Sequence, residues 1–236
     1  MPTLTRSTTE TADLLSLAVH EFRTPVTVVA GYLRMLAKEQ AGPLADRQKA
    51  LILEAEKSCA RLTALVAELS DLANLESATA ALAHEDVVLD PIVDEVIASV
   101  AEGRDRGIAV ARDQAAPTPP VAGDRKRLRD IVQALLVSVL REQSAPLTVF
   151  VHTGTRVIDG TPMVVVGIGA GDSSRRVLDS ADRADSRLNE ARGGLGMALP
   201  IARRVVEHLG GRVWSSATDR AVGSVGLALP IRDGTP

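Results

Sequence analysis

The sequence predicts a helical hairpin that dimerises into a four-helix bundle, followed by an α/β sandwich with three helices on a mixed sheet. Two apolar seams with heptad spacing, both before residue 77, predict the hairpin. Alternating strand-like and helix-like segments after residue 85 predict the sandwich. We expect a flexible N-terminus at 1–12, a hairpin domain at 13–76, an Ala-rich linker at 77–85 and the sandwich at 86–232.

The first helix is expected over residues 13–38, where apolar side chains recur at alternating spacings of four and three. These are Leu15, Val19, Phe22, Val26, Val29, Leu33 and Leu36. Gly42-Pro43 breaks the helix, because proline cannot continue it. A second seam follows at Leu51, Ala55, Ser58, Leu62, Leu65, Leu69 and Leu72.

A lone hairpin cannot bury two such wide apolar stripes. We therefore expect a homodimer in which two hairpins share one core. The alternative is that the hairpin packs on the remainder of its own chain.

The remaining residues predict the sandwich. Strands are expected at 86–89, 107–112, 147–157, 163–167, 212–216 and 224–231, and helices at 91–101, 124–142 and 195–209. Asp124 is placed to cap the second of these helices, and Asp159-Gly160 to turn a hairpin. The polar stretch 170–192 is predicted to be a loop, long enough to suggest function or disorder.

Composition excludes several classes of function. Among 236 residues, 27 basic and 30 acidic side chains leave a net charge of −3, which argues against nucleic-acid binding by bulk electrostatics. Aromatic residues are 2% of the chain, too few for a base-stacking platform. Cys59 is the single cysteine, so an internal disulfide or a cysteine-based zinc site is excluded.

Localisation is inferred from what the sequence lacks. No apolar run approaches the roughly 18 residues that a membrane span requires. Residues 1–12 have no apolar segment of the kind found in signal peptides. We expect a cytoplasmic protein, or the cytoplasmic piece of a longer one, with neither nucleic acid nor membrane as a partner of this chain.

The sharpest chemical feature is His20, at the edge of the first seam. A neutral imidazole is a nucleophile toward a phosphoryl group, and the adjacent Glu21 can take or hold its proton. Thr24 lies one turn on, where its hydroxyl can orient a water. Pro25 bends the helix at this site and costs about 3 kcal/mol inside a helix. The alternative is an ordinary exposed histidine.

These residues carry a resemblance to a known family. His20-Glu21-Phe22-Arg23-Thr24-Pro25-Val26-Thr27, followed by Gly31-Tyr32-Leu33, resembles the phospho-acceptor box of two-component sensor histidine kinases. Residues 69–76 are similar to that family's second dimerisation helix. The C-terminal part resembles its Bergerat-type ATP-binding domain.

The resemblance implies a role for each residue of the box. His20 is the phosphorylated residue, Glu21 its acid–base partner, and Thr24 the residue that positions water for dephosphorylation. The implied partner is the receiver domain of a response regulator.

The C-terminal part departs from the family at the nucleotide site. Gly193 to Leu199 is similar to the second glycine box, so the resemblance assigns nucleotide contacts to Gly194 and Gly196. The first box keeps Gly169 and Gly171, but Gly167 stands where the family has an aspartate that binds adenine.

Two further departures concern the metal and the lid. Where the family has two asparagines, one of them a magnesium ligand, this chain has Ala134 and Ser138. Alanine cannot ligate a metal, and a lone hydroxyl is a poor magnesium ligand. Residues 172–192 also lack the phenylalanine-centred box expected in an ATP lid. We therefore expect no resident metal or cofactor and a C-terminal domain that has lost ATP binding.

Three functions stay open. The first is phosphotransfer at His20, exchanging phosphoryl with a response-regulator aspartate or removing it. The second is an active kinase that uses ATP and magnesium, with a repositioned ligand such as Gln133 or Glu142. The third is a non-catalytic pseudokinase that regulates a partner kinase, and the intact His20, Glu21 and Thr24 argue against it.

Overall fold

The structure is a computed structural model that describes residues 3–76, 85–114, 116–181, 188, 190, 197–216 and 223–232. The chain divides into two compact units, Met1–Ala81 and Leu82–Pro236. Among the described residues, no helix combines the length and the apolar character needed to cross a bilayer.

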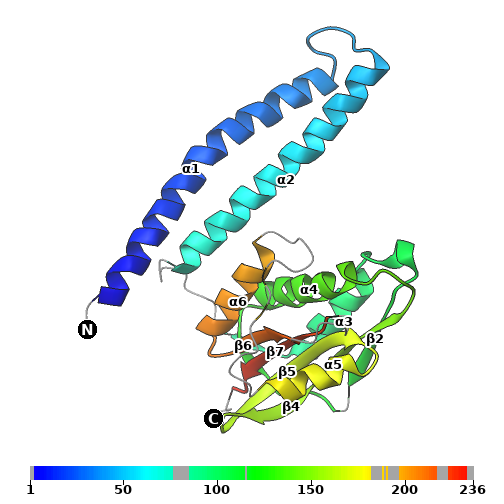
Figure 1. The fold of residues 1–236 in the computed structure, drawn as a ribbon. Helices are drawn as coiled ribbons and strands as arrows, with labels where there is room; N and C mark the ends of the chain where they lie inside the picture. Colours follow the sequence, from blue (N-terminus) through cyan, green and yellow to red (C-terminus); the bar gives the residue numbers. More distant parts are fainter. Residues whose placement is uncertain are drawn as a thin grey trace. The chain divides into compact units, whose positions relative to one another are not determined.

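The first unit is a hairpin of two long helices, α1 (Thr3–Ala37) and α2 (Asp46–Glu76) (Figure 1). The helices pack along their length, where Val19, Cys59, Val66 and Ala73 are buried. Helix α1 begins at Thr3 instead of residue 13, so most of the segment expected to be flexible is helical. Once a helix has nucleated, each further residue adds a hydrogen bond, and polar residues such as serine and threonine tolerate this extension.

The predicted seam on α2 is only partly the contact between the two helices. Leu51 and Leu62 belong to that seam, yet their exposed fractions are 65% and 51%. The buried line runs instead through Cys59, Val66 and Ala73, which repeat every seven residues. The apolar stripe is wider than one helix–helix contact, so its remainder stays on the surface of the hairpin.

The second unit is a sandwich. Its helices are α3 (Leu89–Ser99), η1 (Arg104–Arg106), α4 (Arg125–Arg141), α5 (Ser173–Arg176), η2 (Val177–Ser180) and α6 (Ala198–His208). Its strands are β1 (Glu85–Val87), β2 (Ala109–Gln114), β3 (Val121–Gly123), β4 (Thr148–Ile158), β5 (Thr161–Ala170), β6 (Arg212–Ser215) and β7 (Val225–Pro230).

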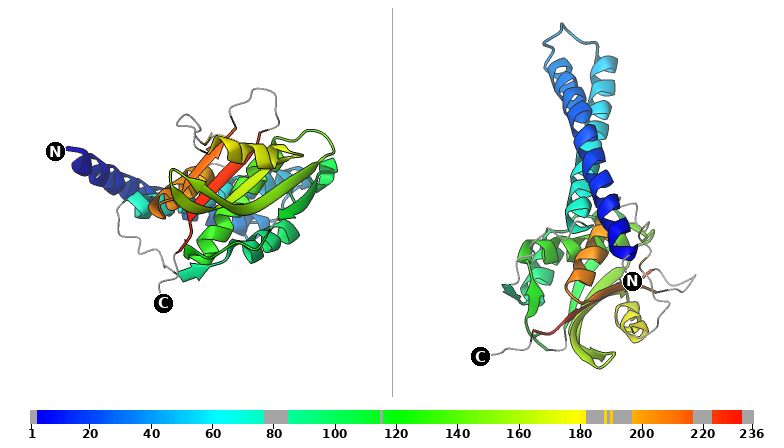
Figure 2. Two further views of the ribbon diagram at one scale, coloured as in Figure 1. Left: turned by 90° about the horizontal axis from the view of Figure 1, so that it is seen from below. Right: turned by 90° about the vertical axis from the view of Figure 1, so that its left-hand side faces the viewer.

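Five strands form one sheet in the order β2-β4-β5-β7-β6. The β2–β4 pair is parallel and the other pairs are antiparallel, so the sheet is mixed, as predicted. Helices α3, α4 and α6 cover one face, and α5 with η2 covers the other (Figure 2). Strands β1 and β3 form a separate two-stranded sheet that the sequence analysis did not predict.

Local signals place several elements correctly. The Asp124 side chain accepts a hydrogen bond of 2.8 Å from the backbone N–H of Arg127, which confirms the cap of α4. Asp159 and Gly160 both have positive φ, as a tight β-hairpin turn between β4 and β5 requires. Helix α3 begins two positions before Pro91, which still lies in the first turn, where proline is tolerated.

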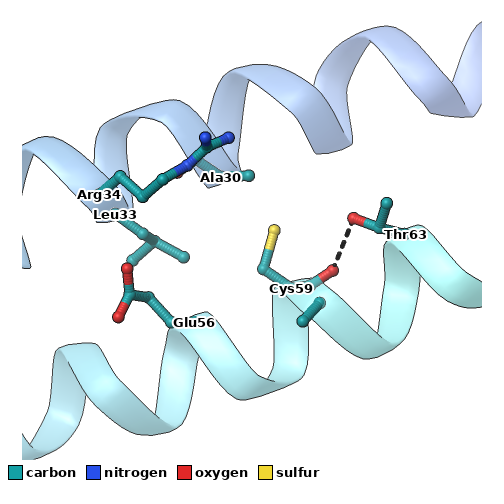
Figure 3. Close-up of a pocket in the computed structure, with 7 residues that line it drawn as sticks. Ala30, Leu33, Arg34, Glu56, Cys59 and Thr63 are labelled. Atoms are coloured by element: carbon teal, nitrogen blue, oxygen red, sulfur yellow. Dashed lines mark hydrogen bonds between the residues drawn. The ribbon is translucent and has the colours of Figure 1, made fainter.

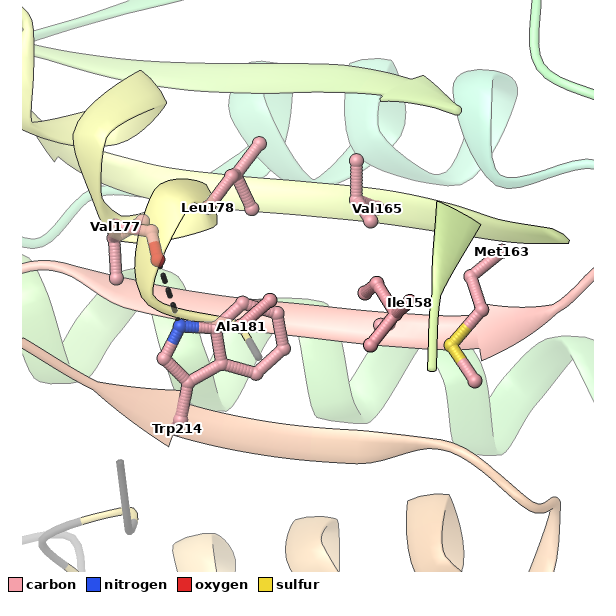
Figure 4. Packing of buried hydrophobic residues seen from close by; sticks show 8 residues of the cluster. Ile158, Met163, Val165, Val177, Leu178, Ala181 and Trp214 are labelled. Carbon is pink, nitrogen blue, oxygen red and sulfur yellow. Dashed lines mark hydrogen bonds between the residues drawn. The ribbon is translucent and has the colours of Figure 1, made fainter. Parts of the chain in front are cut away.

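The predicted loop 170–192 is wrong over its first part. Residues 173–180 form α5 and η2, and Val177, Leu178 and Ala181 are buried with Trp214 in one apolar cluster (Figure 4). The segment is too short and too polar for a helical period to show in the sequence. Burial of its three apolar side chains against the sheet fixes its conformation instead.

Leu135 lies on the buried side of α4, with an exposed fraction of 1%. We predict that Leu135→Ala lowers the free energy of unfolding of the second unit by about 2–5 kcal/mol, because the substitution leaves a cavity. Urea unfolding followed by fluorescence of Trp214, the single tryptophan, measures the change. Val157→Ala is the matched control, since Val157 is largely exposed and should change the unfolding midpoint little.

Candidate functional site

His20 lies on the exposed side of α1, one residue after the buried Val19. Glu21 and Thr24 are exposed on the same helix. Residues four apart are neighbours on a helix surface, so Thr24 lies one turn beyond His20. The structure therefore holds the three predicted residues together on a surface that a second protein can reach.

Helix α1 continues through Pro25 without interruption. Proline has no N–H, so the Glu21 carbonyl lacks its ordinary helical donor next to His20. The hydroxyl of Thr27 donates 2.8 Å to the Arg23 carbonyl, a back-bond that tends to bend helices. The backbone next to His20 therefore has one carbonyl without its helical donor, within a helix that is otherwise continuous.

Two grooves flank the line of contact between α1 and α2, and both are lined in part by Leu33 and Cys59. The first, of about 400 Å³, also contains the charged Arg34 and Glu56 (Figure 3). The second, of about 540 Å³, is apolar. It is lined by Pro25, Val26, Val29, Leu33, Ala55, Ser58, Cys59 and Leu62.

The positions that match the family's asparagines lie on α4. Ser138 is fully buried, and its hydroxyl donates 2.7 Å to the carbonyl of Leu135 in its own helix. Ala134 is half-buried and carries no polar atom on its side chain. The amide oxygen of Gln133 accepts from Arg129 at 3.0 Å. Among the described residues, no group of three or more histidine, cysteine or acidic side chains is arranged to hold a metal.

The first glycine box lies on β5, beneath α5. A Cβ atom at position 167 would overlap the carbonyl oxygen of Ser174. One at position 169 would overlap the hydroxyl of Ser173 and lie 2.8 Å from the Cβ of Ser224. Both glycines therefore allow α5 to approach the sheet closely. Gly171 has positive φ and open space around it.

Asp113 on β2 ties α5 to the sheet. Its carboxylate accepts from Nε and a terminal nitrogen of Arg175, at 2.6 and 2.7 Å, and lies 3.2 Å from Nδ1 of His152. The hydrogen bond from Arg175 and, secondarily, that from His152 lower the pKa of the Asp113 carboxyl below its usual value. Sequence analysis missed this cluster, because Asp113, His152 and Arg175 come from three distant segments with no shared motif.

Gly194 and Gly196 lie outside the described residues, so their predicted contacts with nucleotide stay predictions. The same holds for most of the predicted linker, 77–85, of which the structure describes only Glu85.

The two units, a hairpin with an exposed histidine and an α/β sandwich, are both similar to parts of known histidine kinases. Residues 11–78 match the family model for the His Kinase A (phospho-acceptor) domain. The cell-division control histidine kinase PdhS of Brucella ovis is 24% identical over 215 residues, and so is that of Brucella abortus. Each match covers 86% of this chain and 21% of the relative, so the chain spans about a fifth of their length.

Solved structures show the same fold. Full-length ShkA, crystallised in complex with AMPPNP, superposes with a TM-score of 0.68 at 22% identity, over 92% of this chain and 45% of that one. The Acinetobacter baumannii histidine kinase AdeS gives a TM-score of 0.56 at 17% identity, over 91% of this chain and 98% of AdeS. Residues 11–78 are thus a His Kinase A (phospho-acceptor) domain by their match, and the chain as a whole is similar to sensor histidine kinases.

The lowered pKa of Asp113 makes the stability of the second unit depend on pH. A carboxyl whose folded pKa lies below its unfolded value, about 3.9, stabilises the fold above that value. This contribution is lost as the pH falls through the folded pKa.

We predict that the unfolding free energy reported by Trp214 falls more steeply below pH 4 in the unmodified protein than in Asp113→Asn. Parallel curves for the two proteins would contradict this assignment.

Proposed function

We propose that this chain carries phosphoryl on His20 and exchanges it with, or removes it from, a response-regulator aspartate. The observation that carries the proposal is the exposed His20, with Glu21 and Thr24, within a His Kinase A domain. In functional terms, we assign dimerisation and phosphotransfer to residues 13–76 and an ATPase-like fold to residues 86–232, with residues 77–85 as the linker.

The proposed transfer begins at the neutral imidazole of His20. One ring nitrogen attacks the phosphorus of a receiver aspartyl phosphate, forming a P–N bond while the P–O bond to the aspartate breaks and its carboxylate leaves. Glu21 takes or holds the proton of the imidazole, and Thr24 orients a water for dephosphorylation. The exposure of all three residues gives a receiver domain access to them.

We also propose that the second unit has lost ATP binding. In support, the Ser138 hydroxyl is committed to Leu135 in the interior of the domain, and Ala134 has no ligand atom. At position 167 a carboxylate is missing, and the backbone of Ser174 occupies the space where its side chain would begin. Metal and adenine contacts are thus both weakened by residues that the structure describes.

We propose further that the chain is a homodimer through the apolar groove of about 540 Å³. Phe22, Val29 and Leu62 leave at least half of their side-chain surface exposed on the hairpin. Contiguous apolar surface of this kind marks an interaction site. A second hairpin offers the matching stripe and would complete a four-helix core.

A labelling experiment tests the phosphotransfer. Receiver domains phosphorylated with labelled acetyl phosphate should transfer label to the unmodified chain and not to His20→Gln. His208→Gln is the matched control, because His208 is also exposed on a helix and should leave labelling unchanged. Label on His20→Gln equal to that on the unmodified chain would exclude His20 as the acceptor.

A second arm uses labelled ATP with magnesium. We expect no label on His20, because phosphoryl transfer from ATP relies on a bound metal to neutralise charge. Efficient autophosphorylation would overturn the loss of ATP binding and establish an active kinase instead.

Sedimentation tests the dimer. Leu62→Glu should convert the protein to a monomer at micromolar concentration, because burying an unpaired charge costs several kcal/mol. Lys57→Glu is the control, since Lys57 is highly exposed on the same helix and its ion pair with Glu54 lies on the surface. A monomeric unmodified protein would show that the groove is not a dimer interface.

A further inference from the structure

Residues 172–181, named the strap here, run across the sheet face opposite α3, α4 and α6 (Figures 2 and 4). Val177, Leu178 and Ala181 each have an exposed fraction of 2%. The indole N–H of Trp214 donates 2.8 Å to the Val177 carbonyl. The middle and end of the strap are therefore part of the core, and the single tryptophan reports on their position.

The start of the strap is held differently. Its α5 turn exposes Arg175 and Arg176 and buries only Ser174. Two side chains tie α5 to the sheet, since Arg175 pairs with Asp113 and the Ser173 hydroxyl donates 2.6 Å to the Ala170 carbonyl. The α5 turn thus depends on polar contacts at its surface more than on apolar burial.

Arginine side chains hold the later part of the strap. Arg156 donates 2.8 Å to the Leu178 carbonyl and 3.0 Å to the carboxylate of Asp179. Arg212 donates 2.9 Å to the Ala181 carbonyl. These bonds satisfy carbonyls at the end of a short helix, which lack intrahelical donors. The end of the strap is consequently anchored by burial and by hydrogen bonds together.

The residue before the strap has the properties of a hinge. Gly171 has a φ of 51°, a conformation that residues with a side chain rarely adopt, and nothing lies within 4 Å of where its Cβ would be. Its N–H donates 3.4 Å to the Thr148 carbonyl, and its carbonyl accepts 3.2 Å from the Ser174 hydroxyl. The first end of α5 is therefore held by these two long hydrogen bonds and by the pair of Arg175 with Asp113.

We propose that the α5 turn is a latch, flanked by Gly171 on one side and by the anchored end of the strap on the other and closed by the Asp113–Arg175 pair, whose closed state keeps any ligand away from β5 at Gly167 and Gly169. The inference goes beyond the proposed loss of ATP binding, because it assigns the exclusion to a movable segment. It does not depend on phosphotransfer at His20. Opening the latch would uncover the face of the sheet at the two glycines of the central strand β5.

Hydrogen–deuterium exchange of the full chain, analysed by peptide, tests the latch. Asp113→Asn should raise the exchange rates of peptides within 172–178 about tenfold, since bidentate charge-assisted bonds are lost, while α4 peptides keep their rates. Arg176→Gln is the matched control, because Arg176 lies in the same turn but forms its ion pair with Asp172, an exposed residue of the strap itself.

A second variant reaches the open state without touching the ion pair. Gly167→Ala places a Cβ atom against the Ser174 carbonyl, so it should lift α5, red-shift Trp214 emission and increase acrylamide quenching. Gly154→Ala on the neighbouring strand is its control, because a Cβ there makes only ordinary contact, 3.6 Å from His152.

The outcomes separate the latch from a static element. Faster exchange in α5 alone, in both variants, supports it. If exchange became equally faster in α5 and α4 peptides, the turn would not open by itself. If exchange rates in Asp113→Asn were unchanged, the ion pair would not hold the turn. Either result overturns the latch. Protection of the unmodified protein by magnesium and AMPPNP would contradict the loss of ATP binding, and the variants would still decide the latch.

Discussion

The backbone of α5 lies so close to β5 that only glycine fits at positions 167 and 169. The organisation of this sheet face follows from that contact. It brings Val177 and Leu178 over the sheet, gives the Trp214 indole an acceptor and places Arg175 beside Asp113. A larger residue at either glycine would move α5 away from the sheet and so break all of these contacts at once. Close-packed interiors cannot accommodate an added methyl group without such a shift.

The two units differ in how much of their apolar surface they bury. In the sandwich, α4 buries Leu128, Leu135 and Leu136 almost completely, and both faces of the sheet are covered. In the hairpin, Phe22, Leu51 and Leu62 stay more than half exposed. A domain that completes its own core needs no second copy, whereas a hairpin with such a surface favours one. The proposed chemistry at His20 therefore lies on the unit that exposes apolar surface, and the covered sheet lies on the unit that does not.

Sequence predicted those features whose cause is local. The Asp124 cap and the Asp159-Gly160 turn each depend on a few adjacent residues, and both are present. The histidine motif was equally local. The strap was missed because Ser173, Ser174 and Arg175 are polar, and because their conformation depends on partners on β2 and β5. The α2 contact line was misplaced because the heptad pattern does not distinguish the partner within the hairpin from a partner outside it.

The proposed loss of ATP binding is compatible with an intact fold, because groups at the candidate site find partners within the protein. The buried hydroxyl of Ser138 is satisfied by the Leu135 carbonyl in its own helix. Gly167 lets α5 pack closely against the sheet. An unpaired carboxylate buried at this position would cost more folding free energy than the glycine does. The sandwich thus has the fold of the histidine kinases to which it is similar, while at positions 138 and 167 its groups pack and bond within the chain.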